Sequence, residues 1–210
     1  ERGGDKLFDA YGNGHHAEIH GATWVRVPDY DYEREVAEWV QSIGGTVQVH
    51  RVEHGGFEFV SSPDDVADGD RYTGRNVLLD GNQIVTDGDL ERLTDLAELR
   101  YVRLIGTNIS DAGLAYLARC RSLERVHLNK TGITSAGLTQ LAGLPLVGLS
   151  VDATGLTQGG LNTVAQISTL EHLSLSRNDL SEFDLSKLSE LPVLSELGIY
   201  ETRIGDADLP

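Results

Sequence analysis

Cysteine and methionine are almost missing from this 210-residue chain, which has one cysteine, Cys120, and no methionine at all. A single cysteine excludes a disulfide within the chain. The sequence contains no stretch of about 18 consecutive apolar residues, which a membrane-spanning helix would need, and no signal peptide is visible. Because the chain starts at Glu1 without a methionine, we expect the natural protein to begin upstream. The localisation therefore stays open between the cytoplasm and export after removal of an upstream segment.

The sequence also lacks the motifs of the common enzyme classes. It has no Gly-x-Ser-x-Gly elbow, no phosphate-binding Gly-Lys-Ser/Thr loop and no dinucleotide fingerprint. Its 24 glycines are scattered instead of gathered in one loop. Arg119 and Arg121 flank Cys120 and would lower its thiol pKa if the thiol were exposed, but a small buried residue is the interpretation we favour. The sequence therefore predicts a protein that is not an enzyme and needs no cofactor.

Charge is unevenly distributed. The formal net charge of −16 favours solubility and repels nucleic acids and anionic membranes, so neither is an expected partner. Residues 99–145, however, carry six Lys/Arg against two acidic residues, a local charge of +4, which leaves −20 for the rest of the chain. A basic region inside an acidic protein indicates a selective contact surface.

A sequence motif recurs along the second part of the chain. TNISDAGLAYL at 107–117 returns as TGITSAGLTQL at 131–141 and as TGLTQGGLNTV at 154–164. Each copy follows the pattern L-x-x-L-x-L-x-x-[TN]-x-[IL], with Val or Ile at some of the leucine positions. A period of 23 to 25 residues is typical of a solenoid. The copies begin at Leu99, Leu123, Leu146, Leu170 and Leu194, and a degenerate copy begins at Val77.

Each position of the repeat has a physical role. The alternating apolar pair predicts a short strand with one buried face, and the following Asn or Thr bonds to the turn backbone. A Ser or Thr then stands where a helix would begin, followed by apolar residues spaced i, i+3. The predicted strand residues are Val102, Leu104, Val126, Leu128, Leu149, Val151, Leu173 and Leu175, and the predicted N-caps are Thr86, Ser110, Thr134, Thr157 and Ser181.

This pattern resembles the leucine-rich repeat family, in particular short bacterial repeats of the GALA-like kind. The resemblance covers residues 74–210, about five full coils and a truncated one. It implies an α/β fold: a right-handed solenoid with a parallel sheet on the concave side and short helices on the convex side. Such a protein would serve as a binding scaffold.

Residues 1–73 do not repeat, and we predict that they form a small α/β cap on the solenoid. Residues 32–43 have the apolar spacing of an amphipathic helix, which Gly44 and Gly45 would end. TVQVHRV and FEFV at 57–60 then predict two strands, and WVRV at 24–27 a further one. A cap of this kind would cover the apolar end of the first coil.

One stretch of the N-terminal segment raises the possibility of a metal site. In GNGHHAEIH, the side chains of His16, Glu18 and His20 would share one face if the chain were extended, and imidazole with carboxylate suits zinc. No cysteine partner and no His-Glu-x-x-His motif accompany them. We therefore favour a polar stretch without a metal.

The predicted binding surface lies on the outward positions of the strands in the basic region. Arginine beside aromatic residues on a rigid sheet is typical of a binding hot spot. The alternative is that Asp80, Glu124 and Asp152 neutralise these arginines across strands. The candidate residues are Tyr101, Arg103, Ile105, Arg125, His127, Asn129 and His172.

We predict that a protein partner with acidic groups docks on these residues. Two other interpretations remain open at this stage. In the first, the chain is a cell-surface or periplasmic module that binds a carbohydrate or an anionic polymer. In the second, it is a targeting subunit of a larger enzyme.

Overall fold

The computed structural model describes residues 6–7, 17–20, 23–26, 32–51, 57–60 and 72–204. Near the N-terminus, β1 (Lys6–Leu7), β2 (Ala17–His20) and β3 (Thr23–Arg26) form a small antiparallel sheet. The strand predicted around residue 24 is therefore present. It does not belong to the main sheet, which contains the remaining eight strands.

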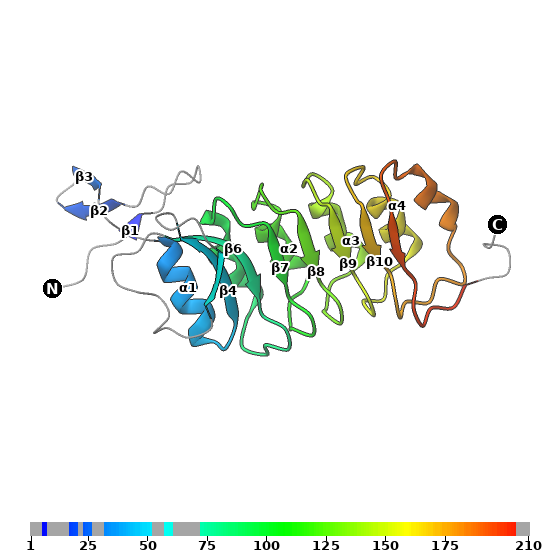
Figure 1. Ribbon diagram of the computed structural model, residues 1–210, viewed down its shortest axis with the longest axis horizontal. Coiled ribbons are helices and arrows are strands. Elements are labelled where there is room, and N and C mark those ends of the chain that lie inside the picture. The colour runs from blue at the N-terminus through cyan, green and yellow to red at the C-terminus, as the bar shows by residue number, and fades with distance from the viewer. Residues whose placement is uncertain are drawn as a thin grey trace.

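Six parallel strands, one from each coil, make up most of the main sheet (Figure 1). Alternation of apolar and polar residues is regular enough that every pair keeps the same register, with Val102 opposite Val126 and Val126 opposite Leu149. The strands are β6 (Tyr72–Leu78), β7 (Tyr101–Arg103), β8 (Arg125–His127), β9 (Gly148–Ser150), β10 (His172–Ser174) and β11 (Glu196–Gly198).

Short helices connect these strands and lie together on one side of the sheet (Figure 1). The apolar strand residues and the apolar helix faces enclose one continuous core, in which all eight predicted strand residues are buried. The right-handed α/β solenoid predicted from the repeat is confirmed. The helices are η2 (Asp87–Asp95), α2 (Asp111–Leu117), α3 (Ser135–Leu138), η3 (Thr139–Leu141), α4 (Gln158–Val164) and η4 (Leu185–Glu190), where η marks a 3₁₀ helix.

The Asn and Thr positions close each strand as predicted. The hydroxyls of Thr107 and Thr131 donate to the carbonyls three residues earlier, at 2.8 and 2.6 Å. The Asn178 amide group donates to the carbonyls of Val151 and Leu175, both at 3.0 Å, and so joins two coils. These bonds satisfy backbone groups that the turn would otherwise leave buried and unpaired.

The turn after each strand needs one residue in the left-handed backbone region. Gly81 and Gly106 occupy this position in the first two coils, with φ of 68° and 67°. In the next coils the same position holds Lys130, Ala153 and Arg177, with φ of 55°, 53° and 60°. A residue with a side chain pays a conformational cost in this region of backbone angles. We attribute its tolerance at these three positions to the stacked coils, which hold the turn in place.

Each coil caps the helix of the next one. Asp87 accepts hydrogen bonds from the backbone N–H and the hydroxyl of Ser110, at 2.8 and 2.5 Å. Asp111 accepts the same two bonds from Thr134, both at 2.7 Å. The carboxylate fits because the facing residue of the next helix is glycine: a Cβ on Gly113 would lie 2.6 Å from Asp87 Oδ1. We call this series of cross-coil bonds the capping ladder.

Four of the five predicted N-caps stand at the start of a helix. Ser110 and Thr134 accept a bond from their own helix, from Ala112 and Ala136. Thr86 forms a capping box with Asp89, to which its backbone N–H donates. The side chain of Thr157 does not cap its helix; its backbone N–H donates to Ser135 in the preceding coil, at 3.1 Å. Ser181 was wrong as a cap: η4 begins later, with Asp184 as the N-cap.

The N-terminal helix and strands extend the solenoid. Helix α1 (Tyr32–Ser42) ends before Gly44, whose φ is 81°. Strand β4 (Thr46–Arg51) pairs antiparallel with β6, and β5 (Phe57–Val60) pairs antiparallel with β4 at the edge of the main sheet. Asn82 in the first coil donates to the carbonyl of Ile43 at 2.6 Å. The Trp39 ring lies 5.4 Å from the Arg92 guanidinium. Trp39 belongs to the apolar face of this helix, and its side chain is partly buried against the core.

Candidate binding surface

The open face of the sheet consists of the outward-pointing residues of β6 to β11 and of the turns that follow them. Strand register places Tyr101 opposite Arg125 and Arg103 opposite His127 on adjacent strands. Paired residues of neighbouring strands lie about 5 Å apart, so these four side chains form one group. The sequence therefore predicted their juxtaposition correctly.

Tyr101 and His127 form a fixed aromatic pair. The Tyr101 hydroxyl lies 3.1 Å from Nδ1 of His127, and the two rings meet edge to face with centroids 5.1 Å apart. Burial raises the pKa of Tyr101. Burial, followed by the positive charge of Arg103, lowers the pKa of His127, so the imidazole is neutral at pH 7. The hydrogen bond to Tyr101 occupies Nδ1, and Nε2 has no partner among the residues that the structure describes.

Two of the arginines in this region are neutralised within the protein. Arg103 forms an ion pair with Asp80, and Arg100 forms one with Glu124 of the next coil. For Arg103, therefore, the alternative is correct: a carboxylate of the neighbouring coil neutralises its guanidinium. A partner would have to compete with this internal carboxylate.

Arg125 differs from its neighbours. Its side chain is exposed and makes no ion pair with any residue in the described part of the chain. Its aliphatic stem lies over β9, where Gly148 leaves space: a Cβ there would lie 3.3 Å from Cγ of Arg125. The glycine thus lets the arginine lean across the sheet and keep its charged end in solvent.

These side chains surround a shallow depression on the open face. Tyr101 and His127 form an aromatic wall, and Arg125 supplies an unpaired positive charge at the rim. The depression crosses the first three parallel strands. It is lined by Asn76, Arg100, Tyr101, Glu124, Arg125 and His127.

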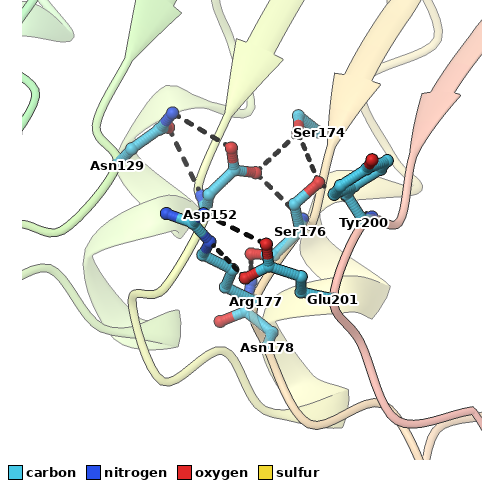
Figure 2. A network of polar contacts seen from close by, with 8 residues as sticks. All are labelled: Asn129, Asp152, Ser174, Ser176, Arg177, Asn178, Tyr200 and Glu201. Carbon is cyan, nitrogen blue, oxygen red and sulfur yellow. Dashed lines mark hydrogen bonds and ion pairs between the residues drawn. The ribbon is translucent and has the colours of Figure 1, made fainter.

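Beyond β9 the open face carries a hydrogen-bonded network centred on Asp152 (Figure 2). One carboxylate oxygen accepts from the Ser174 hydroxyl at 2.6 Å and from the Ser176 backbone at 2.9 Å. The other accepts from the Asn129 amide at 3.1 Å. Asn129 is thus satisfied within the protein and is not free to contact a partner. Asp152, Ser174 and Ser176 were not among the predicted site residues.

The remaining candidates lie apart from the depression. Ile105 is half-buried in the turn after β7. His172 stands on β10, two strands beyond Arg125, with its Nε2 3.6 Å from a Glu196 carboxylate oxygen. Three of the seven predicted residues therefore line the depression, Tyr101, Arg125 and His127. Arg103 lies beside them and is paired with Asp80.

Cys120 lies in the described structure, whereas the side chains of the metal candidates do not. Cys120 is buried, and burial raises the pKa of its thiol to about 12, so the flanking arginines do not activate it. His16 lies outside the described residues, as do the side chains of Glu18 and His20. In the described part of the chain, no three His, Cys, Asp or Glu side chains are placed to hold a metal ion. Nor does that part contain a helix long and apolar enough to cross a membrane.

Comparisons with known proteins agree with the repeat assignment. Residues 119–142 match a family model described as "Leucine Rich repeat". Among solved structures, the chain is similar to an internalin from Listeria monocytogenes, with 18% identity and a TM-score of 0.38. That match covers 60% of this chain and 48% of the internalin, so the chain spans about half of its length. A search of curated proteins gives no match. The coils that stack from residue 77 to residue 204 are leucine-rich repeats.

Proposed function

We propose that this protein is a non-enzymatic binding scaffold that recognises a protein partner through the open face of its sheet. The observation that carries the proposal is Arg125, an unpaired cation beside an aromatic pair, on a surface whose other charges are mostly neutralised internally. Arginine and tyrosine on a rigid, preorganised surface are the residues that most often dominate protein interfaces.

The charge distribution supports an acidic partner surface at this point. The chain as a whole carries −16, so a partner with acidic groups is repelled from most of the molecule. Arg125 attracts such groups at one place only. An electrostatic arrangement of this kind provides selectivity more than it provides affinity.

A carbohydrate or anionic polymer fits the structure less well. A polymer of repeating negative charge is best held by a row of unpaired cations, and here Arg100 and Arg103 are both paired with carboxylates. We therefore place this alternative second.

The test is affinity capture with the full chain as bait, with three variants compared. We expect a partner to be captured by the wild type and by Arg121→Glu, and to be lost with Arg125→Glu. Arg121 is the matched control because it is also exposed and lies outside the open face, in the segment after α2. The captured protein is then measured against each purified variant by calorimetry.

Equal affinity for wild type and Arg125→Glu would contradict the proposal and place the site elsewhere on the molecule. Circular dichroism melts of all three proteins establish that they fold equally. Since Arg125 has no internal partner among the described residues, its reversal removes no ion pair from the fold.

A further inference from the structure

We propose that Arg125 and His127 together bind one carboxylate of the partner, and that His127 takes up a proton when they do. This inference rests on the proposed function and names the chemistry of its central contact. Proton uptake of this kind makes the protein bind its partner with higher affinity in mildly acidic solution.

The hydrogen bond to Tyr101 orients the histidine for this task. Nδ1 is held at 3.1 Å from the Tyr101 hydroxyl, so Nε2 is left to face a ligand in the depression that both rings line. Arg125 lines the same depression from the neighbouring position on β8. A guanidinium and a ring N–H that meet at one place form a two-point site for a single carboxylate.

The free protein keeps this histidine uncharged. The groups that act on it are Arg103 and Tyr101 on β7, Arg125 on its own strand, and the carboxylates of Asp80 and Asp152 on coils to either side. Both carboxylates are already engaged, Asp80 with Arg103 and Asp152 with Asn129 and Ser174. Burial and the two arginines therefore outweigh them, and the pKa of His127 falls below its usual 6.5.

A bound carboxylate reverses this balance. It brings a negative charge within hydrogen-bonding distance of Nε2, which favours the protonated ring and raises the pKa of His127 in the complex. Protonated His127 then donates from Nε2 to the carboxylate and from Nδ1 to the Tyr101 oxygen. Because the bound form holds one more proton, affinity rises as the pH falls and is lost as the pH rises through the pKa of the complex.

Among the described residues that line the depression, the one carboxylate does not substitute for the ligand, because Glu124 is held by Arg100. A rise of one unit in the pKa of His127 corresponds to a tenfold gain in affinity at low pH.

The experiment uses the full chain with ¹³C-labelled histidine and a blocked glutamate, N-acetyl-glutamate amide, as the probe. The His127 resonance is assigned by its loss in His127→Gln, and its pKa is followed by NMR without and with the probe. We expect the probe to raise that pKa by about one unit and to bind severalfold, at most about tenfold, more tightly at pH 5.5 than at pH 7.5. Blocked glutamine should do neither.

Two variants sharpen the result. His127→Gln should bind the blocked glutamate with affinity that no longer changes between pH 5.5 and 7.5, and Arg125→Gln should bind it far more weakly at both. Arg125→Gln changes an exposed side chain, so it reports on the site even if His127→Gln fails to fold. An unchanged pKa of His127 at high probe concentration, or no binding of the probe, would overturn the inference.

The two proposals fail in different ways. Capture of a partner that depends on Arg125 but shows no pH dependence would keep the proposed function and discard proton uptake. Proton-linked binding of blocked glutamate without any Arg125-dependent partner would keep the carboxylate site and discard protein recognition.

Discussion

Replacing Gly113 with alanine should destabilise the protein, although helix propensity alone predicts the opposite. Gly113 lies inside α2, and alanine in place of glycine within a helix normally stabilises by about 1 kcal/mol. Here the added Cβ would lie 2.6 Å from Asp87 Oδ1, 2.8 Å from Ile109 Cγ2 and 3.0 Å from Leu90 Cδ1. The first two distances are shorter than a Cβ atom adopts and the third is tight, so neighbouring side chains must move.

The size of the effect follows from what has to move. Ile109 and Leu90 are fully buried, and forcing extra volume between them costs about 1–3 kcal/mol. Displacing Asp87 Oδ1 also breaks its bond to the Ser110 backbone N–H, and a bond to a charged group is worth about 1.5–3 kcal/mol. After the gain of about 1 kcal/mol in helix propensity is subtracted, we expect a net loss of about 1.5–5 kcal/mol.

Urea denaturation followed by circular dichroism measures this loss, provided that the slope with denaturant is unchanged. Gly159→Ala is the matched control. It is also a glycine in the first turn of a helix, and its nearest neighbour to a new Cβ is Thr157 Oγ1 at 3.6 Å. We expect that variant to gain about 0.5–1 kcal/mol. If Gly113→Ala were as stable as Gly159→Ala, the capping ladder would not constrain the spacing of the coils.

Further variants test other parts of the fold. Leu128→Ala removes a fully buried side chain and should cost about 2–5 kcal/mol in urea denaturation, whereas the exposed Val193→Ala should cost under about 0.5 kcal/mol. Ala153→Gly relieves a left-handed backbone and should raise stability by about 0.5–1 kcal/mol; no gain would mean that the turn is unstrained. Cys120 should resist thiol reagents at pH 8 in the folded protein and react fully in urea. Because its folded pKa of about 12 exceeds the usual 9, stability should also decline above about pH 9, and Cys120→Ser should remove that decline. Deleting residues 1–73 should give an insoluble or molten product, since β4 and α1 cover the first coil; a soluble 74–210 fragment that melts cooperatively would make the N-terminal segment an independent domain.

The repeat was predictable because its signal is periodic and redundant. Val102, Val126 and Leu149 recur at a fixed spacing, and one register satisfies all of them. The same period placed Tyr101, Arg125 and His127 on one surface. Alternation fixes which way a strand residue points, and this requires no knowledge of rotamers.

The pairing of the charges was not predictable in the same way. Arg103 and Asp80 stand 23 positions apart, as do Asn129 and Asp152, and several carboxylates compete for each donor. Which pair forms depends on side-chain rotamers and on small residues nearby, such as Gly148 beneath Arg125. Ser181 failed as a helix cap for a related reason. Asp179 accepts from the Ser181 hydroxyl at 2.7 Å, and this local turn delays the helix.

The capping ladder gives the stack a direction. In every case described the carboxylate or hydroxyl comes from the earlier coil and the bonded residue from the later one, as with Asp87 and Ser110 or Ser135 and Thr157. The start of a helix thus depends on the coil before it and not on the coil after it. We therefore expect that removing coils from the C-terminal end leaves the helix starts of the remaining coils intact.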